Sequence, residues 1–461
     1  MSRTPTPTPG PPPEPMPDGI TNVYIFDTFN TMSWIVVQST PMILYLQHLN
    51  ASATILAVAA GMAPLLNILQ MPAARFVEQV GYRRFVLAGW TSRSFLIIGM
   101  AIVTLLPESV DPATRIVLML FLSFLFNALR GISVCGVLPW FTHIVPESRR
   151  GEFLARDQFA VALSTILSFL VFGLLLSGGR AWYSFGVVYS LSFVSALVSL
   201  YFLRRIPDVP VEKITPNPAP LPWKDMLFHP PFFRYLRYIL VINFAFGISN
   251  VFWVRFFRVL LHASDTLTLV NSAITIMVLA IVLFLVAPMI DRTGNKTVLM
   301  VSGIGYVVHF LGWASVAAGL LPFNWVIIAW QALTAGFSGA LWSLANIRAV
   351  MGIVPVMGRP HFLALYSVAS NVTLGIAPLL CGPVVDYLGH WHVSWMSWSW
   401  NSYSLLYCGL SFTIFVGVCV LRTIDEPHQM TWDVFMTELL VKTPSRAVSR
   451  LVGRLRGPGT G

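Results

Sequence analysis

The sequence predicts an all-α polytopic membrane protein with twelve transmembrane helices, arranged as two six-helix pseudo-repeats. Three observations predict this class. Of the 461 residues, 56% are apolar and 10% are charged, whereas about 25% are charged in a typical soluble domain. Apolar segments of the length that spans a bilayer, about 20 residues, recur along the chain. Motifs of the first half also return in the second half. A soluble enzyme, a nucleic-acid-binding domain and a secreted disulfide scaffold are therefore disfavoured.

The N-terminal segment 1–21 is rich in proline and does not have the pattern of a signal peptide, which predicts a disordered cytosolic tail. Apolar segments then follow at regular intervals. Barrel strands are disfavoured, because they would alternate polar and apolar residues over about ten positions. We expect twelve transmembrane helices, at 22–46, 52–73, 84–106, 114–142, 155–178, 181–203, 235–257, 266–289, 296–318, 323–347, 361–387 and 402–423.

The longest polar connection, 204–234, contains several prolines and divides the membrane region into bundles at 22–203 and 235–424. We expect this connection to be a cytosolic linker. In the C-terminal segment 425–461, apolar residues recur mostly three or four positions apart and cations follow them. That pattern predicts an amphipathic, basic tail on an anionic membrane surface, with a solvated helical tail as the alternative.

The placement of charge predicts the orientation. Most of the 29 Lys and Arg residues lie at or near the side that the N-terminus would occupy, while the opposite connections at 47–51, 319–322 and 388–401 contain none. Because cytosolic loops are enriched in these cations, we expect a multi-pass protein of the plasma (inner) membrane with both termini in the cytosol. Four tryptophans between 390 and 402 predict an interfacial aromatic belt, with a stack of ligand-binding rings as the alternative.

Two matches between the halves indicate an internal duplication. The sequence IVPESRRGEFLA at 144–155 and the sequence IVPVMGRPHFLA at 353–364 agree at seven of twelve positions, with an offset of 209. Repeats of a six-helix unit are typical of secondary transporters, whose halves move about a shared site. The second match has an offset of 213 and pairs Gly81 with Gly294, Glu78 with Asp291, and Arg83 with Lys296.

The loop at 287–296 reads AxxxDRxGNK, where x is any other residue, and resembles the loop motif GxxxDRxGRR of the major facilitator superfamily. The N-terminal copy is degraded, because Glu78 and Gln79 replace the Asp and the Arg. The stretch GIAPLLCGPVVDYLG at 375–389 is similar to the Gly- and Pro-rich eleventh helix of that superfamily. The resemblance covers the whole predicted membrane region. It does not identify a subfamily, and the drug-antiporter motif GxxxGP is absent from the predicted fifth helix.

The resemblance implies a cytosolic gate. It implies that Asp291, and by position Glu78, bind a neighbouring helix end when the cytosolic side is closed, where exposed N–H groups and the helix dipole favour an acid. Arg150 and Arg359 occupy matching repeat positions and could pair with those acids; alternatively, the cations only fix the topology. The loop glycines permit tight reversals between helices. The remaining candidates for this gate are Gly81, Arg83, Arg84, Arg292, Gly294 and Lys296.

Few ionisable side chains lie inside the predicted spans, where each costs about 2.5–3.5 kcal/mol on insertion scales unless it is paired or wet. Asp27 has two interpretations. It exchanges a proton or binds Na⁺ and so couples transport to a gradient, or it pairs with a loop cation near the interface. Arg130 is expected to bind an anionic solute or to neutralise an acid in the bundle. Arg93 is expected to be structural, and His309 to be a core histidine.

The resemblance also implies that spans 1, 4, 7 and 10 line a central cavity. Asp27, Asn30 and Trp34 recur three and four residues apart and share one helical face. Asn127 and Arg130, three apart, share another. Amides hydrogen-bond hydroxyls and indole faces cover C–H surfaces, a set that suits a hydroxylated ring. The candidate substrate or coupling residues are Asp27, Asn30, Trp34, Asn127, Arg130, Asn243, Asn250, Trp253, Gln331 and Trp342.

The sequence therefore predicts a secondary active or facilitative transporter that moves a small polar solute by alternating access, with a sugar as the first candidate. An organic anion held by Arg130 is the second candidate, and drug or lipid export the third. Coupling to H⁺ or Na⁺ is left open, as is a non-transporting sensor with the same fold. We expect a monomer that is not an enzyme and has no cofactor, no metal and no catalytic residue, since P-loop, HExxH and GxSxG motifs do not occur.

Overall fold

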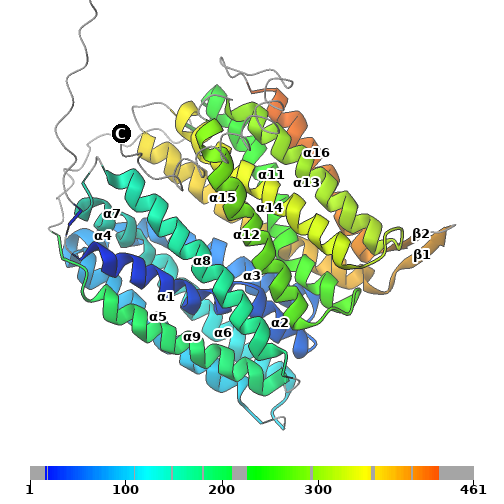
Figure 1. Ribbon diagram of the computed structural model, residues 1–461, viewed down its shortest axis with the longest axis horizontal. Coiled ribbons are helices and arrows are strands. Elements are labelled where there is room, and N and C mark those ends of the chain that lie inside the picture. The colour runs from blue at the N-terminus through cyan, green and yellow to red at the C-terminus, as the bar shows by residue number, and fades with distance from the viewer. Residues whose placement is uncertain are drawn as a thin grey trace, which may run out of the picture.

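The computed structural model (Figure 1) describes residues 16–17, 19–107, 109–146, 149–178, 181–209, 226–290, 294–354, 359–395 and 398–424. Eleven helices in this part of the chain are long and apolar enough to cross a membrane. The first span is a pair of shorter helices, which brings the total to the twelve that the sequence predicts. The expected N-terminal tail (1–21, apart from its last few residues), most of the linker and the C-terminal tail (425–461) lie outside the described residues.

The first bundle contains six spans, three of which are interrupted. The first changes direction at Ser39, the second at a 3₁₀ turn over Asn67–Leu69, and the fourth at a 3₁₀ turn over Val134–Gly136. These interruptions were not predicted, because each segment is continuously apolar. The helices are α1 (Ile20–Gln38), α2 (Thr40–His48), α3 (Ala53–Leu66), α4 (Gln70–Val80), α5 (Tyr82–Thr104), α6 (Pro112–Ser133), α7 (Val137–Ile144), α8 (Arg150–Leu176) and α9 (Ala181–Leu203).

The second bundle contains six uninterrupted spans that repeat the packing of the first. The third span of each bundle packs on the fourth and the sixth, as α5 packs on α6 and α9. This shared pattern confirms the predicted pseudo-repeat. The helices of the second bundle are α11 (Pro230–Val259), α12 (Asp265–Ile290), α13 (Asn295–Ala317), α14 (Trp325–Ile353), α15 (Arg359–Tyr387) and α16 (Ser402–Arg422).

A small antiparallel hairpin, β1 (His392–Trp395) with β2 (Trp398–Asn401), follows α15 in the region predicted as a loop. Trp395 pairs with Trp398 across the hairpin, and the rings of Trp398 and Trp400 lie 5.7 Å apart. Aromatic residues are favoured in strands, and aromatic cross-strand pairs stabilise such pairings. We call the end of the molecule that holds this hairpin the far end, and the end that holds Gly81 and Gly294 the near end; α4 and α7 lie there in Figure 1.

The two bundles meet along two helix pairs, α3 with α15 and α8 with α12. Small residues let the first pair approach closely, as is common between membrane helices. A Cβ added to Gly61 would lie 2.8 Å from the carbonyl oxygen of Gly375, and one added to Gly382 would lie 2.9 Å from the Cα of Thr54. Backbone therefore meets backbone at this interface.

Candidate functional site

A cavity of about 750 Å³ lies between the two bundles, inside the membrane region. Its walls come from α1, α2, α3 and α8 of the first bundle and from all six spans of the second. Membrane proteins tolerate irregular backbone at membrane depth only where it is buried in protein or lines such a cavity. The interruption of the first span at Ser39 fits this rule, because Gln38, Ser39 and Thr40 are all part of the cavity wall.

The wall is polar but carries no formal charge. Within the described part of the chain, no Asp, Glu, Lys or Arg lines the cavity. The polar groups are side-chain amides, hydroxyls and one imidazole, and they alternate with aromatic faces. The amides belong to Gln38, Asn243, Asn250, Asn271 and Gln331, and the indoles to Trp34, Trp253, Trp313 and Trp342.

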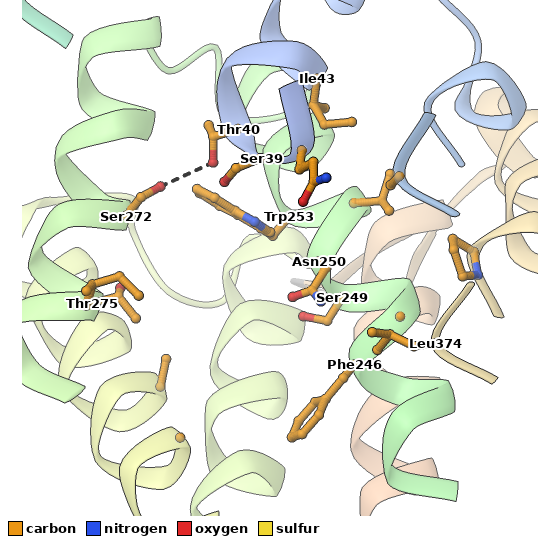
Figure 2. Close-up of a pocket in the computed structure, with 18 of the residues that line it drawn as sticks. Ser39, Thr40, Ile43, Phe246, Ser249, Asn250, Trp253, Ser272, Thr275 and Leu374 are labelled. Atoms are coloured by element: carbon orange, nitrogen blue, oxygen red, sulfur yellow. Dashed lines mark hydrogen bonds between the residues drawn. The ribbon is translucent and has the colours of Figure 1, made fainter. Parts of the chain in front are cut away.

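The structure brings six of the ten predicted substrate or coupling residues to this cavity. Figure 2 shows Trp253 between the Thr40–Ser272 contact on one side and Ser249 and Asn250 on the other. Gln331 is only 1% exposed and lies over Gly312, where an added Cβ would clash with its amide, so its main contact is with α13. The six are Trp34, Asn243, Asn250, Trp253, Gln331 and Trp342.

Asp27 and Asn30 do not line the cavity, although they share a helical face with Trp34. The Asn30 Oδ1 accepts hydrogen bonds from Trp90 Nε1 at 3.1 Å and from the Arg93 guanidinium, which lies 4.0 Å from the Trp90 ring. Arg93 is 3% exposed, so its charge is buried inside the first bundle, where Asn30 and the Trp90 ring contact it. The carboxyl group of Asp27 lies next to that of Asp157 on α8, close enough for the two to interact.

Asn127 and Arg130 also lie outside the cavity wall. Asn127 Oδ1 accepts a hydrogen bond from Gln38 Nε2 at 2.7 Å and so helps to orient Gln38, which does line the cavity. Arg130 donates to Asn67 Oδ1 at 3.1 Å, and Asn67 Nδ2 donates to Asn371 Oδ1 of the other bundle at 3.4 Å. Arg130 therefore belongs to a polar chain that crosses the bundle interface, and its guanidinium does not face the solute space.

Sequence reasoning missed the part of the wall that comes from α12 and α13. Asn271, Ser272 and Thr275 of α12 face the cavity, and so do Tyr306 and His309 of α13. An amide inside an otherwise apolar span was the available signal for the first group. His309 is buried in the C-terminal bundle and its Nδ1 lies 3.1 Å from Thr334 Oγ1, as expected for a core histidine, but it also reaches the cavity.

A carboxylate that was not predicted joins the bundles at the far end. Asp386, in the last turn of α15, accepts hydrogen bonds from the N–H groups of Ala53 and Thr54 at 2.7 and 2.9 Å and from Thr54 Oγ1 at 2.7 Å. It thereby caps the N-terminus of α3, where unpaired N–H groups and the helix dipole favour a negative charge. Arg255 lies 3.5 Å from the same carboxylate and donates to the carbonyl of Ala51 at 3.2 Å.

A second ionic contact lies nearby. His48 Nε2 is 2.6 Å from Asp265, and Arg258 is 3.1 Å from the other oxygen of the same carboxylate. Among the described residues, the hydrogen bonds and ion pairs that join the two bundles therefore lie mostly at the far end; the exceptions are the Asn67–Asn371 contact and the Thr40–Ser272 contact at the cavity wall. These contacts hold the two bundles together at the far end.

The near-end gate residues are only partly described. Gly81 (φ 90°, ψ 149°) and Gly294 (φ 76°, ψ 143°) adopt the same backbone conformation, which is essentially restricted to glycine. Arg83 donates to the carbonyl of Arg204 at the end of α9, Lys296 donates to that of Ile424 after α16 at 2.6 Å, and Arg84 is exposed. Arg83 and Lys296 thus each hydrogen-bond a carbonyl of their own bundle. Asp291, Arg292 and the side chains of Glu78, Arg150 and Arg359 lie outside the described residues.

Comparison with known proteins gives consistent results. The family model described as Major Facilitator Superfamily matches residues 23–321. No curated protein matches the chain. Among solved structures, a mutant of the nucleoside transporter NupG is similar with a TM-score of 0.67 and 15% identity, covering 89% of this chain and 100% of that one. The D-xylose-proton symporter is similar with a TM-score of 0.64 and 14% identity, covering 88% and 96%. A mutant of peptide transporter POT in complex with sulfate has a TM-score of 0.65 and 11% identity, covering 88% and 94%.

Proposed function

Because the chain belongs to the Major Facilitator Superfamily and is a multi-pass secondary transporter of small solutes rather than an enzyme, we propose that it moves a neutral hydroxylated solute, with a sugar as the first candidate. The observation that carries this proposal is the cavity wall, in which the described residues offer amides, hydroxyls and indoles but no Asp, Glu, Lys or Arg. Amides donate to and accept from hydroxyl groups, and indole faces cover C–H surfaces.

The same wall argues against an organic anion. A charge taken out of water costs several kcal/mol unless a counter-charge meets it. Arg130 was the expected counter-charge, but its guanidinium donates to Asn67 and does not line the cavity. The similarity to a nucleoside transporter and to a D-xylose-proton symporter is consistent with a neutral solute that carries a sugar ring.

We further propose that the near end faces the cytosol and that one chain suffices for transport. The enrichment of cations around the near-end connections supports this orientation. With this orientation, the structure is the state that is closed to the outside. The bundles at 22–203 and 235–424 would rock against each other about the α3–α15 and α8–α12 contacts, and Asp291 with Glu78 would latch the cytosolic side in the opposite state.

The coupling ion that we propose is H⁺, carried by Asp27 and Asp157. These two carboxyl groups come from different helices of the same bundle and lie next to each other, and two neighbouring carboxylates do not readily ionise together, so the pair would share one proton. Loss of the proton would leave two like charges side by side in the membrane. Arg93, which binds the neighbouring Asn30, is the nearby cation available to that site.

A ligand screen tests the proposed solute class. Purified protein is heated with D-glucose, D-xylose, uridine, dicarboxylates and dipeptides at millimolar concentration, where even weak ligands register, because stabilisation follows RT ln(1 + [L]/Kd). Neutral hydroxylated compounds should raise the melting temperature, and the same compounds should exchange in proteoliposome counterflow. Stabilisation by dicarboxylates alone would refute the proposal.

A further inference from the structure

The end of α1 presents a polar side chain to the cavity. Gln38 is the last residue of α1 and lines the cavity, and Trp34, one turn earlier on the same helical face, lines it as well. The Gln38 Nε2 donates a hydrogen bond to Asn127 Oδ1 of α6 at 2.7 Å. Asn127 is 2% exposed and does not line the cavity. A residue of the cavity wall is therefore bound to a buried residue outside the wall.

The hydrogen bonds of Asn127 fix the direction in which both amides point. Asn127 Nδ2 donates to the main-chain carbonyl of Ser123 at 2.8 Å. Because a carbonyl can only accept, the nitrogen of the Asn127 amide has to lie on that side and its oxygen has to face Gln38. This oxygen can also only accept, so Gln38 has to present its NH₂ group to Asn127. The side-chain oxygen of Gln38 therefore points away from Asn127.

The oxygen that remains, Gln38 Oε1, is an unpaired and accessible acceptor. Within the described chain it has no hydrogen-bond partner, and it is not one of the unpaired polar atoms that are sealed from solvent, as Trp342 Nε1 is. Because the Gln38 side chain is half-buried and belongs to the cavity wall, a solute can reach this oxygen. Gln38 also ends α1, and the carbonyl end of a helix dipole favours a hydrogen-bond donor over an anion.

From this geometry we propose that Gln38 Oε1 is a specificity-determining acceptor of the solute cavity, and that Asn127 is its positioning residue. A solute hydroxyl donates to Gln38 Oε1, and the indole of Trp34 covers the neighbouring C–H surface of the solute. Because Asn127 keeps the amide from turning over, the site selects a group that donates over one that can only accept. This inference rests on the proposed function, because it specifies how one hydroxyl of a neutral solute is recognised.

The diagnostic measurement compares D-glucose, D-xylose and uridine with analogues in which one hydroxyl is replaced by fluorine, which cannot donate. In the wild type, the analogue fluorinated at the recognised position should bind about 3- to 10-fold more weakly than its parent, as expected for the loss of one neutral hydrogen bond. Gln38→Leu removes the acceptor and should bind both alike. Asn127→Leu frees the Gln38 amide to turn its NH₂ group toward the fluorine, so the discrimination should be largely lost, whereas a purely structural role would weaken both compounds equally.

Thr104→Val provides the matched control in the same bundle. The Thr104 hydroxyl is fully buried, donates to the carbonyl of Ala101 on its own helix at 2.7 Å and does not line the cavity. This variant should keep the wild-type discrimination. Gln38→Met and Asn127→Ser, with the same expected results, replace a leucine variant that fails to fold.

The outcomes separate the acceptor from the proposed function. Unchanged discrimination in Gln38→Leu, in a wild type that binds a neutral solute, would overturn the acceptor alone, as would a wild type that binds every fluorinated analogue as tightly as its parent. Equal weakening of parent and analogue in Asn127→Leu would overturn the part assigned to Asn127. Failure of the wild type to bind any of the neutral parent compounds would overturn both the acceptor and the proposed function.

Discussion

Removal of the Asp386 carboxylate should open the far end. This side chain accepts three hydrogen bonds from the first turn of α3 and so ties the last turn of α15 to the other bundle. Few other groups cross between the bundles there in the described chain, and one of them, Arg255, contacts the same carboxylate. Asp386→Ala leaves the N–H groups of Ala53 and Thr54 without this acceptor and leaves Arg255 without its ion pair.

The size of the effect follows from these contacts. Three hydrogen bonds at about 1 kcal/mol net each would total about 3 kcal/mol. The Asp386 side chain is 27% exposed, so water weakens the interaction, and we take about 2 kcal/mol. The equilibrium between closed and open far ends should therefore shift by a factor of about 30 toward the open form.

Cysteine labelling measures this shift. Ile43→Cys, in a background without the four native cysteines, places a thiol on the cavity wall close to Thr40, where it is 5% exposed in the closed form. A membrane-impermeant maleimide added from the far side should react about 30-fold faster in Asp386→Ala. Asp386→Asn, which keeps one acceptor oxygen but loses the charge, should fall between the two.

Asp111 provides the matched control. It begins α6 at the far end, is exposed, and makes no capping hydrogen bond through its side chain. Asp111→Ala removes the same charge from the same end of the molecule without breaking a contact between bundles, so labelling should stay at the wild-type rate. If the Asp386→Ala protein is monodisperse and is labelled at the wild-type rate, the reasoning is refuted. Equal acceleration in Asp386→Ala and Asp111→Ala would refute it as well.

Three further predictions concern residues that the sequence singled out. Asp27→Asn should abolish solute accumulation driven by a pH gradient in proteoliposomes while counterflow persists, and intact accumulation would contradict H⁺ coupling through the pair with Asp157. Arg130→Met should lower the melting temperature with little change in solute affinity, since its guanidinium binds Asn67 outside the cavity; a large rise in Kd would restore the anion hypothesis. Gly294→Ala should destabilise by about 1–3 kcal/mol because of its positive φ, whereas Gly352→Ala inside α14 should be neutral or stabilising in the same thermal unfolding assay.

The sequence was informative about the fold because bilayer spans are long, apolar and nearly continuous. The positions of the loop glycines also anticipated the repeat, since Gly81 and Gly294 share one unusual backbone conformation. The helix break at Ser39 was not predicted, because the single proline Pro41 lies within an apolar segment that continues on both sides of it. The hairpin after α15 escaped because four-residue strands depend on cross-strand pairs that no local pattern specifies.

The candidate site was only half accessible to sequence reasoning. Helical spacing put Asp27, Asn30 and Trp34 on one face correctly, but seven residues of helix span about 10 Å, and the cavity reaches only Trp34. Spacing also cannot show that α12 and α13 turn Asn271 and His309 toward the cavity, because this depends on how six helices pack. The family resemblance implied that spans 1, 4, 7 and 10 line the cavity, and it gave no reason to examine α12 and α13.

The contact between Gly61 and Gly375 has a mechanical consequence. An added Cβ at Gly61 would lie 2.8 Å from the carbonyl oxygen of Gly375, and the side chains of Leu65 and Leu379 flank the contact, so the two helices have little room to approach further. We expect it to act as a fulcrum for the two bundles, with the Asp386 contact toward the far end and the near-end loops on the other side. Separation at one end then forces approach at the other, which makes simultaneous opening of both ends, and hence a leak, geometrically difficult. A methyl group added at this fulcrum would separate the bundles and should uncouple the two ends.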